Sequence, residues 1–324
     1  MWSPLLWWVL AALPLRPLDG IALSPHYENP AEGLTFDQMV DEIAALGASH
    51  ISVVVQWGQA DITQTSITPH PKETQEDQVV RRIIRRAKGR GLAVVVFPIL
   101  WLDRRAVGEW RGTLAPTDPD AWWESYHRFI LHYARLAAEE QADLFSVGSE
   151  LASLEGEEAR WRRLIGEVRG VFAGQLLYSA NWDHYADVPF WDALDYVGLT
   201  AYYTLTDKHD ASEDELTQAW IGIRDRLVPW ARKVAKPLVF TELGYASIDG
   251  AATAPWDYTR STVADVEEQR RCFAAFTRAW QGEPTLGGVF FWNWWGPGGR
   301  EDRWYTLKGK PAVDVVKAWF ERAR

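Results

Sequence analysis

The sequence predicts an α/β protein built as a single (β/α)8 TIM barrel. From residue 21 onward, short β-branched or aromatic runs alternate with longer segments of helical period, which is the pattern of repeated βα units. Several of the short runs are continuously apolar, such as AVVVF at 93–97, as is typical of parallel strands covered on both sides. An open doubly wound sheet would show a Gly-rich phosphate turn after its first strand, and SPHY at 24–27 is not such a turn.

Eight strands are predicted in order along the chain, each from an apolar run of strand length. They lie at 20–24, 50–57, 92–100, 143–149, 176–181, 196–203, 237–243 and 288–294. Because eight strands alternating with helices close a barrel, their carboxyl ends are expected to share one catalytic face.

Eight helices are predicted between and after these strands, from apolar residues at helical spacing. They lie at 35–46, 77–89, 121–139, 157–172, near 190–194 (a short one), and at 212–234, 263–281 and 312–322. Thr35 and Ser212 are suitable N-caps, Gly47 and Gly89 suit helix ends, and Pro237 follows a finished helix. The second helix carries a cluster of Arg and Lys between apolar residues, which we interpret as its solvent-exposed face.

The composition permits one globular domain over residues 19–324, since 47% of the residues are apolar and 24% are charged. Residues 1–18 form an apolar leader that is too short to span a bilayer and resembles the hydrophobic part of a signal peptide. No Lys or Arg precedes the apolar run and no clear cleavage site follows it. A secreted or periplasmic location is therefore the first expectation, with a cytoplasmic protein carrying an N-terminal extension as the alternative.

Charge and cysteine usage exclude several classes of function. The net charge of −10 would repel nucleic acid, so a neutral substrate fits better. Cys272 is the only cysteine, which excludes an intrachain disulfide and a CxxC motif. The seven histidines form no HxH or HExxH motif, and a G-x-S-x-G elbow and a P-loop are lacking, so we expect neither a metal nor a cofactor. A monomer is expected.

The content of 20 Trp residues is high and favours a carbohydrate partner. Trp combines a flat apolar face with a polar edge, and sugar rings present surfaces that suit such a face. Long connections after strands are predicted at 58–76, 103–120 and 246–262, on the face where a barrel binds its substrate.

Two carboxylates stand at equivalent places in this count. Glu150 directly follows the apolar strand at 143–149, and Glu242 lies near the end of the strand at 237–243, so both belong to the catalytic rim on strands four and seven. Two carboxylates facing one cleft are what a retaining glycosidase needs, one as acid/base and one as nucleophile. Either residue alone could be a solvated or ion-paired loop residue, but the matched positions favour catalysis.

Most of the chain, from residue 21 to the end, resembles glycoside hydrolase family 113, known for β-mannanase activity in the large clan of retaining barrel glycosidases. The resemblance rests on WWESY at 122–126, FSVGSEL at 145–151, FWDALDYVG at 190–198, FTELGY at 240–245 and FWNW at 291–294. It implies that Glu150 is the general acid/base and Glu242 the nucleophile, with β-mannan or a manno-oligosaccharide as the leading substrate.

This chain departs from the clan at two places. Most members have Asn before the acid/base, where it holds the 2-hydroxyl of the sugar, whereas this chain has Ser149. The shorter side chain reaches less far, and Asn181 at the end of the fifth strand is a candidate for that contact. The third strand ends in FPILW at 97–101, where mannanase-like relatives tend to be more polar.

Strand alternation selects further candidates for substrate binding. Gly198, Thr200 and Tyr202 share one face of strand six, and the clan resemblance implies that Tyr202 donates a hydrogen bond to Glu242. The same alternation places Phe290, Trp292 and Trp294 on one face of strand eight, with Trp292 or Trp294 as a sugar-stacking platform. The remaining candidates are Trp182, Trp101 and Trp57 for further subsites, although core packing is as good an explanation, and Gln56, His26 and Asn181 for sugar hydroxyls.

Two alternative functions remain open from the sequence. A carbohydrate-binding barrel without catalysis would keep the Trp platforms and would not need two spaced carboxylates. A barrel enzyme for phosphorylated metabolites would carry a Gly-rich phosphate cup after strands seven and eight, for which GPGG at 296–299 is the one hint.

Overall fold

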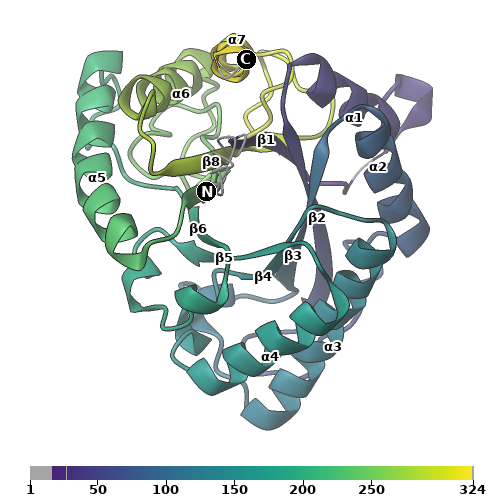
Figure 1. Ribbon diagram of the computed structural model, residues 1–324. Helices are drawn as coiled ribbons and strands as arrows, with labels where there is room; N and C mark the ends of the chain where they lie inside the picture. The colour runs from purple at the N-terminus through teal and green to yellow at the C-terminus, as the bar shows by residue number, and fades with distance from the viewer. Residues whose placement is uncertain (1–16, 27, 323–324) are drawn as a thin grey trace, which may run out of the picture.

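The computed structural model describes residues 17–26 and 28–322 and forms a closed barrel of eight parallel strands. The predicted leader at 1–18 lies outside the described residues apart from its last two. Neighbouring strands pair in chain order and β8 pairs with β1, which closes the cylinder seen in Figure 1. The strands are β1 (Leu18–Leu23), β2 (His50–Gln59), β3 (Ala93–Leu102), β4 (Leu144–Ser149), β5 (Gln175–Asn181), β6 (Tyr196–Thr200), β7 (Leu238–Leu243) and β8 (Leu286–Trp294). The predicted fold class is confirmed.

Seven α-helices surround the barrel in the described part of the chain, one fewer than predicted. They are α1 (Phe36–Ala45), α2 (Asp77–Gly89), α3 (Pro119–Glu139), α4 (Glu158–Val171), α5 (Glu213–Val234), α6 (Val266–Trp280) and α7 (Ala312–Glu321). The short helix predicted near 190–194 is found as a 3₁₀ turn, Trp191–Ala193; the connection from β5 to β6 contains one further 3₁₀ turn, Tyr185–Asp187, and no α-helix. Pro189 lies between them and lacks the N–H that a continuous helix would need.

The predicted helix caps at Thr35 and Ser212 are confirmed. The Thr35 hydroxyl accepts a hydrogen bond from the backbone of Gln38, whose side chain returns to the backbone of Thr35. Ser212 and Glu215 form the same reciprocal pair at the start of α5. Each pair satisfies two N–H groups that a helix start leaves unbonded, which is why these sequences begin helices at these points.

The core consists of two layers separated by the barrel wall. Strand alternation in β2 shows the principle: Val54 belongs to the cluster inside the barrel, whereas Val53 and Val55 pack outward against the helices. The inner cluster comprises Leu18, Val54, Val95, Phe97, Ile99, Leu144, Leu177, Tyr196, Val239 and Phe290. These side chains fill much of the barrel interior, together with buried polar residues of the same face, such as Ser52 two residues before Val54.

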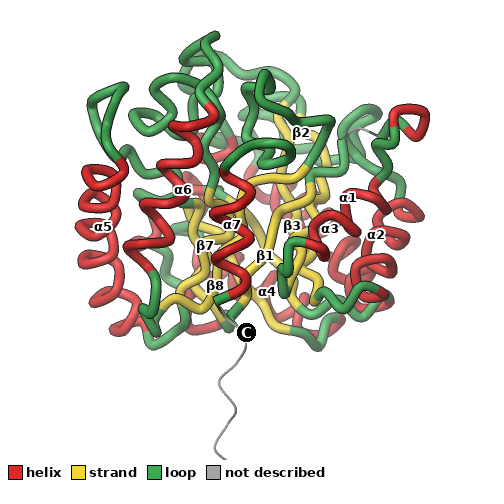
Figure 2. The backbone as a smooth tube through the Cα atoms, turned by 90° about the horizontal axis from the view of Figure 1, so that it is seen from above, coloured by secondary structure: helices red, strands yellow, loops and turns green. Residues whose placement is uncertain are grey.

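The long connections gather at one end of the barrel, uppermost in Figure 2. Backbone hydrogen bonds tie two of them together: Ala115 N–H donates to the Ile62 carbonyl at 2.9 Å, and Thr117 N–H donates to the Thr63 carbonyl at 2.9 Å. The loop after β3 is thereby fixed against the loop after β2. These loops form the walls around the carboxyl ends of the strands.

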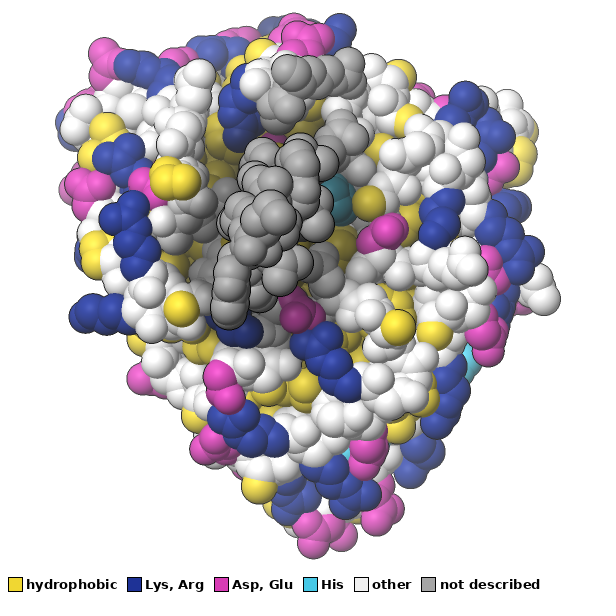
Figure 3. Space-filling view, in the orientation of Figure 1, with side chains coloured by type: hydrophobic (Ala, Val, Ile, Leu, Met, Phe, Trp, Pro, Cys, Tyr) yellow, Lys and Arg dark blue, Asp and Glu magenta, His cyan; other side chains and the backbone are white. Residues whose placement is uncertain are grey.

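The basic residues of α2 lie on its outer face, as predicted, and they are paired. Arg85 contacts Glu140 at 2.6 Å, and Arg86 and Arg90 both contact Asp41 at 2.5 Å. Figure 3 shows Lys and Arg side chains interspersed with Asp and Glu around the outer surface. This cluster therefore joins neighbouring helices and offers no continuous basic surface. Within the described residues, none of the helices is long and apolar enough to cross a membrane.

Candidate active site

Glu150 is the first residue after β4 and is fixed through both its backbone and its side chain. Its N–H donates to the Ser179 carbonyl on β5 at 2.8 Å, and its backbone is left-handed, with φ of 57°. The Thr200 hydroxyl lies 2.6 Å from Glu150 Oε1, and Arg111 Nη2 lies 3.1 Å from Oε2. Both carboxylate oxygens therefore have partners, and the side chain is 9% exposed.

Glu242 lies in β7 and is buried, with 2% of its surface exposed. The Tyr202 hydroxyl donates to Glu242 Oε2 at 2.8 Å. Glu242 Oε1 is buried and has no hydrogen-bond partner among the described residues. The two oxygens of this carboxyl group are therefore unlike: one is held, and the other is free to meet a substrate.

The end of β6 links the two carboxyl groups. Thr200 is the register partner of Glu242 across β6 and β7, and its hydroxyl reaches Glu150. Val197, Leu199 and Ala201 pack outward, as the alternation predicted. The predicted Tyr202–Glu242 hydrogen bond is confirmed. Since burial raises the pKa of Tyr202 far above its ordinary value, this hydroxyl keeps its proton and remains a donor.

The pKa of Glu242 is determined by its burial and by its charged and polar neighbours. Burial, and then repulsion from Glu150, raise the pKa of Glu242 to about 8, whereas the charge of Arg111 and the Tyr202 hydrogen bond lower it. The raised pKa of Glu242 therefore reflects its burial and the closeness of the second carboxyl group, Glu150, in the same site.

Several predicted polar residues lie buried with an unsatisfied atom. Gln56 follows Val54 on the inner face of β2, and its Oε1 has no partner among the described residues; the same is true of Ser149 Oγ. Asn181 donates to Asp183 at 2.6 Å and lies 3.2 Å from the Thr200 hydroxyl, so its amide is engaged. His26 pairs with Glu73 at 3.5 Å and is partly exposed.

The predicted shared face of Trp292 and Trp294 is wrong. Trp292 packs against the inner cluster, to which Phe290 belongs, and also against the outer cluster. Trp294 is 4% exposed, and its indole N–H donates to Glu42 of α1 at 2.8 Å. The register between β1 and β8 shifts so that Ala22 pairs with Trp292 and Leu23 with Trp294, which skips one residue and breaks the alternation.

Of the other aromatic candidates, Trp182 is the one in an aromatic surface pair. It stacks on Trp256, with ring centres 6.0 Å apart and an interplanar angle of 21°, and Trp256 is 50% exposed. Trp57 instead packs against Phe129 and His132 of α3, on the outer side of the barrel. Trp101 is partly buried and has the guanidinium group of Arg105 over its ring at 5.9 Å.

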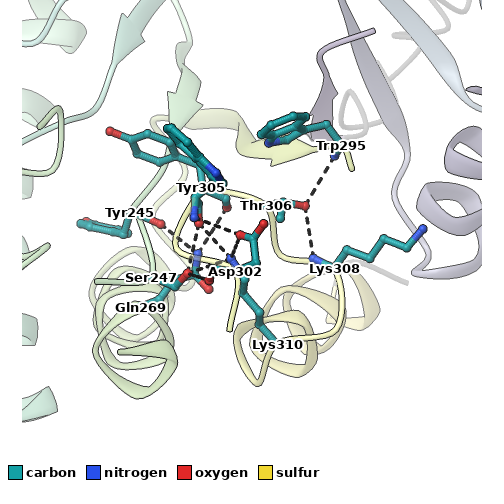
Figure 4. A network of polar contacts seen from close by, with 10 residues as sticks. Tyr245, Ser247, Gln269, Trp295, Asp302, Tyr305, Thr306, Lys308 and Lys310 are labelled. Atoms are coloured by element: carbon teal, nitrogen blue, oxygen red, sulfur yellow. Dashed lines mark hydrogen bonds and ion pairs between the residues drawn. The ribbon is translucent and has the colours of Figure 1, made fainter. Parts of the chain in front are cut away.

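A polar network in the loop after β8 supports the wall beside Glu242. The Lys310 ammonium group is fully buried and donates to the Ser247 hydroxyl, the Asp302 carboxylate and the Trp304 carbonyl, at 2.7 to 2.8 Å (Figure 4). Gln269 donates to the carbonyls of Tyr245 and Tyr305 (Figure 4). The Tyr305 ring, held in this way, lies 6.1 Å from the ring of Tyr202.

The comparisons with known proteins agree with this geometry. Residues 27–310 match the model of Glycoside Hydrolase Family 113. The chain belongs to glycoside hydrolase family 113. It is a glycoside hydrolase with a carbohydrate substrate.

Solved structures of family 113 superpose closely on this hydrolase. A β-mannanase from Alicyclobacillus acidocaldarius, in complex with ManMIm, has a TM-score of 0.84 at 27% identity and covers 96% of this chain and 99% of its own. A second structure, a family 113 β-1,4-mannanase, has a TM-score of 0.83 at 23% identity, with 95% and 99% covered, and this likeness concerns the fold. No curated protein matches the sequence.

Sequence reasoning about this family 113 hydrolase missed two residues that contact the carboxyl pair. Arg111 lies in a 3₁₀ turn (Arg111–Thr113) within the loop after β3, and no local pattern indicates that this loop reaches Glu150. Thr200 was placed on the correct face but was given no role. Its parity with Tyr202 was the signal that could have identified it.

Proposed function

We propose that this family 113 hydrolase cleaves β-1,4-mannosidic bonds with net retention of configuration, with Glu242 as nucleophile and Glu150 as general acid/base. The β-mannan specificity is supported by the likeness to the Alicyclobacillus β-mannanase, which extends over nearly the whole of both chains. The Trp182–Trp256 pair, in which Trp256 is half exposed, supports a substrate of several sugar units, since such faces suit stacking on sugar rings.

The observation that carries the catalytic assignment is the difference between the two oxygens of Glu242. Oε2 accepts the Tyr202 hydrogen bond, so Oε1 is the oxygen available to attack an anomeric carbon. Glu150 is the neighbouring carboxyl group, held by the Thr200 hydroxyl at Oε1 and by Arg111 at Oε2. A carboxylate ready to attack and a neighbouring group able to hold a proton are the two requirements of retaining hydrolysis.

The reaction then follows in two steps. In the first, a bond forms between Glu242 Oε1 and the anomeric carbon, the glycosidic C–O bond breaks, and the Glu150 proton passes to the leaving oxygen. In the second, Glu150 takes a proton from water, the water oxygen bonds to the same carbon, and the bond to Glu242 breaks. The Tyr202 hydrogen bond orients Glu242 throughout.

The remaining contacts of the sugar at the cleavage point are assigned to buried groups that have spare bonding capacity. Ser149 Oγ, Gln56 Oε1 and Asn293 Oδ1 each lack a partner among the described residues and are suited to sugar hydroxyls. Asn181, whose side chain already contacts Asp183 and Thr200, is assigned a supporting contact with the sugar. Trp292 is assigned as the stacking platform for the sugar ring, and the partly exposed His26 is assigned to the rim of the site.

The proposal is tested with β-1,4-linked mannohexaose and purified protein. Product lengths identify the bond cleaved, and proton NMR in the first minutes identifies the anomer released. We expect the β-anomer first, followed by slow mutarotation. Release of the α-anomer first would overturn the retaining mechanism. Cleavage of a β-glucan or a β-galactan without cleavage of mannohexaose would overturn the assigned sugar.

Two isosteric variants test the assigned residues. Glu150→Gln should lower kcat/KM on mannohexaose by about 10²- to 10⁴-fold, the usual contribution of a positioned general acid. Glu242→Gln should abolish turnover, because an amide cannot form the glycosyl intermediate. Glu267→Gln, on the outer face of α6 where Glu267 pairs with Arg270, is the matched control and should retain wild-type activity. Wild-type turnover in Glu242→Gln would disprove the assigned nucleophile.

A further inference from the structure

Glu155 is a buried carboxyl group that the chemistry above does not use. It is 3% exposed and follows a 3₁₀ turn (Ala152–Leu154) five residues after Glu150. The Tyr178 hydroxyl donates to Glu155 Oε1 at 2.7 Å. A charged side chain is costly to bury, so a partner or a function is needed to explain its place.

Tyr178 connects this carboxyl group to the backbone beside Glu150. Its hydroxyl oxygen accepts a hydrogen bond from the Leu151 N–H at 3.0 Å, and Leu151 directly follows Glu150. The ring is held by Trp161 and Phe190, with ring centres 5.0 and 5.4 Å away. A buried, tightly packed tyrosine therefore carries a hydrogen-bond chain from Glu155 to the backbone that orients Glu150.

The direction of this chain follows from the single proton of the tyrosine. Burial, and then the charge of Glu155, raise the pKa of Tyr178 far above its ordinary value, so the hydroxyl keeps its proton. An ionised Glu155 can only accept, so Tyr178 donates to it and turns a lone pair toward the Leu151 N–H. Chains of this kind strengthen each bond in turn.

The charge of Glu155 depends on several neighbours. Burial raises its pKa to about 7, the Tyr178 hydrogen bond and the charge of His184 lower it, and the charges of Asp187 and Asp183 raise it. Around neutral pH the group is therefore partly ionised. The hydrogen bonds of Tyr178 are defined by the geometry, and a negative charge on Glu155 strengthens them.

The backbone at Glu150 is where such support is needed. A left-handed φ of 57° is unfavourable for a residue other than glycine, and it persists where neighbouring groups fix it. Two consecutive β5 residues, on opposite faces of the strand, do so: the Ser179 carbonyl accepts the Glu150 N–H, and the Tyr178 hydroxyl accepts the Leu151 N–H. Gly148 leaves room for this packing, since a Cβ there would lie 2.5 Å from the Tyr126 hydroxyl and 3.1 Å from Tyr178 Cε2.

We propose that Tyr178 and Glu155 are positioning residues that hold the backbone of Glu150 in the conformation from which its carboxyl group delivers a proton to the leaving oxygen. This inference rests on the proposed function of Glu150 as acid/base. We call the hydrogen-bonded pair of Tyr178 and Glu155 the relay. The relay touches neither the substrate nor the reacting atoms.

The test uses leaving groups that differ in their need for a proton. The full-length protein and its Tyr178→Phe variant are assayed on phenyl β-mannobioside, whose departure needs acid assistance, and on 2,4-dinitrophenyl β-mannobioside, whose departure does not. kcat/KM reports the steps up to cleavage of the glycosidic bond in both cases. We expect a loss of about 10- to 100-fold on the phenyl substrate, the effect of a small misplacement of a catalytic group, and less than about 3-fold on the dinitrophenyl substrate.

Further variants separate positioning from general structural damage. Glu155→Gln keeps an acceptor for the Tyr178 hydroxyl and should fall between wild type and Glu155→Leu on the phenyl substrate. Tyr196→Phe is the matched control, because it removes the hydrogen bond that another buried tyrosine donates to Gln175, on the inner side of the barrel wall, whereas Tyr178 belongs to the outer cluster. That control should leave both substrates unaffected. If Tyr178→Phe does not fold, the two Glu155 variants test the same relay.

Glu150→Gln is the reference that keeps the two hypotheses apart. If it lowers kcat/KM on the phenyl substrate far more than on the dinitrophenyl substrate, Glu150 is the acid, and the relay can be judged on its own. Equal losses on both substrates for Tyr178→Phe and Glu155→Leu, or no loss on either, would then overturn the relay. If Glu150→Gln itself makes no distinction between the substrates, the assigned acid/base is wrong, and the relay is overturned with it.

Discussion

The Thr200 hydroxyl at the end of β6 lies 2.6 Å from Oε1 of Glu150, which follows β4, and only β5 separates these two strands. Two residues further along, Tyr202 donates to Glu242. Because side chains of one strand face the same side at every second position, one short segment provides a donor to each carboxyl group. The relative orientation of the two carboxyl groups is therefore determined largely by the end of β6.

Replacement of Thr200 by Val tests this relationship at Glu150. The change keeps the shape of the side chain and removes the donor to Oε1. A hydrogen bond to a charged group contributes about 1.5–3 kcal/mol, so kcat on mannohexaose should fall by about 10- to 100-fold. Thr200→Ser keeps the hydroxyl and should remain within a few-fold of wild type. Equal activity of the Val and Ser variants would exclude a role for this bond.

Replacement of Tyr202 by Phe should move the acidic limb of the kcat/KM profile to higher pH. The Tyr202 hydrogen bond lowers the pKa of Glu242, and its loss therefore raises that pKa. The nucleophile must be ionised to attack, so the variant loses activity at a pH where the wild type still works. The shift should be about one pH unit. A profile unchanged in position would contradict the electrostatic role assigned to Tyr202.

Replacement of Arg111 by Met should shift the same limb in the same direction, because the positive charge of Arg111 also lowers the pKa of Glu242. Arg111→Lys keeps the charge and loses the planar guanidinium group, so its pH profile should stay nearer to that of the wild type. The comparison separates the effect of charge from that of the 3.1 Å contact with Glu150. Identical profiles for the Met and Lys variants would show that the charge is not the cause.

The sequence predicts the parts of this site that follow from strand geometry. Glu150 and Glu242 were located because a carboxyl group at the end of a buried strand lies at the barrel mouth, and Tyr202 because its parity is fixed by the apolar residues around it. The seven α-helices and all eight strands follow from the same periodicity.

The errors arose where periodicity no longer determines position. Trp294 was assigned to the wrong face because the register shift between β1 and β8 depends on both strands. The sequence of one strand alone does not indicate it. Arg111 was missed because a long loop has no period, and its path depends on hydrogen bonds to another loop, such as that from Ala115 to Ile62. Glu155 was missed because its partner, Tyr178, is distant in sequence.

The buried Lys310 should contribute strongly to stability. It has three acceptors and no exposed side-chain surface, so Lys310→Met would leave Asp302, whose side chain is only 15% exposed, without its ion-pair partner. Removal of one partner from a buried ion pair costs about 3–5 kcal/mol, which for a chain of this length corresponds to roughly 4–7 °C in Tm. Lys308→Met, which removes a more exposed pair with Glu42, is the matched control and should cost at most about 1 kcal/mol. Scanning calorimetry of both variants at pH 7 distinguishes them.

Replacement of Trp256 by Ala should weaken binding of long substrates and leave the chemistry intact. Trp256 is half exposed and stacks on Trp182, away from the hydrogen bonds of the two carboxyl groups, so its removal takes away a platform without disturbing them. A lost stacking contact of about 1.4 kcal/mol raises KM for mannohexaose about tenfold at constant kcat.

Trp256→Phe keeps a flat apolar ring and should restore most of the affinity. The aryl mannobiosides are too short to reach every subsite and provide the internal control. A loss of equal size on mannohexaose and on these short substrates would place Trp256 at the cleavage point, and no loss on either would exclude it from the substrate cleft.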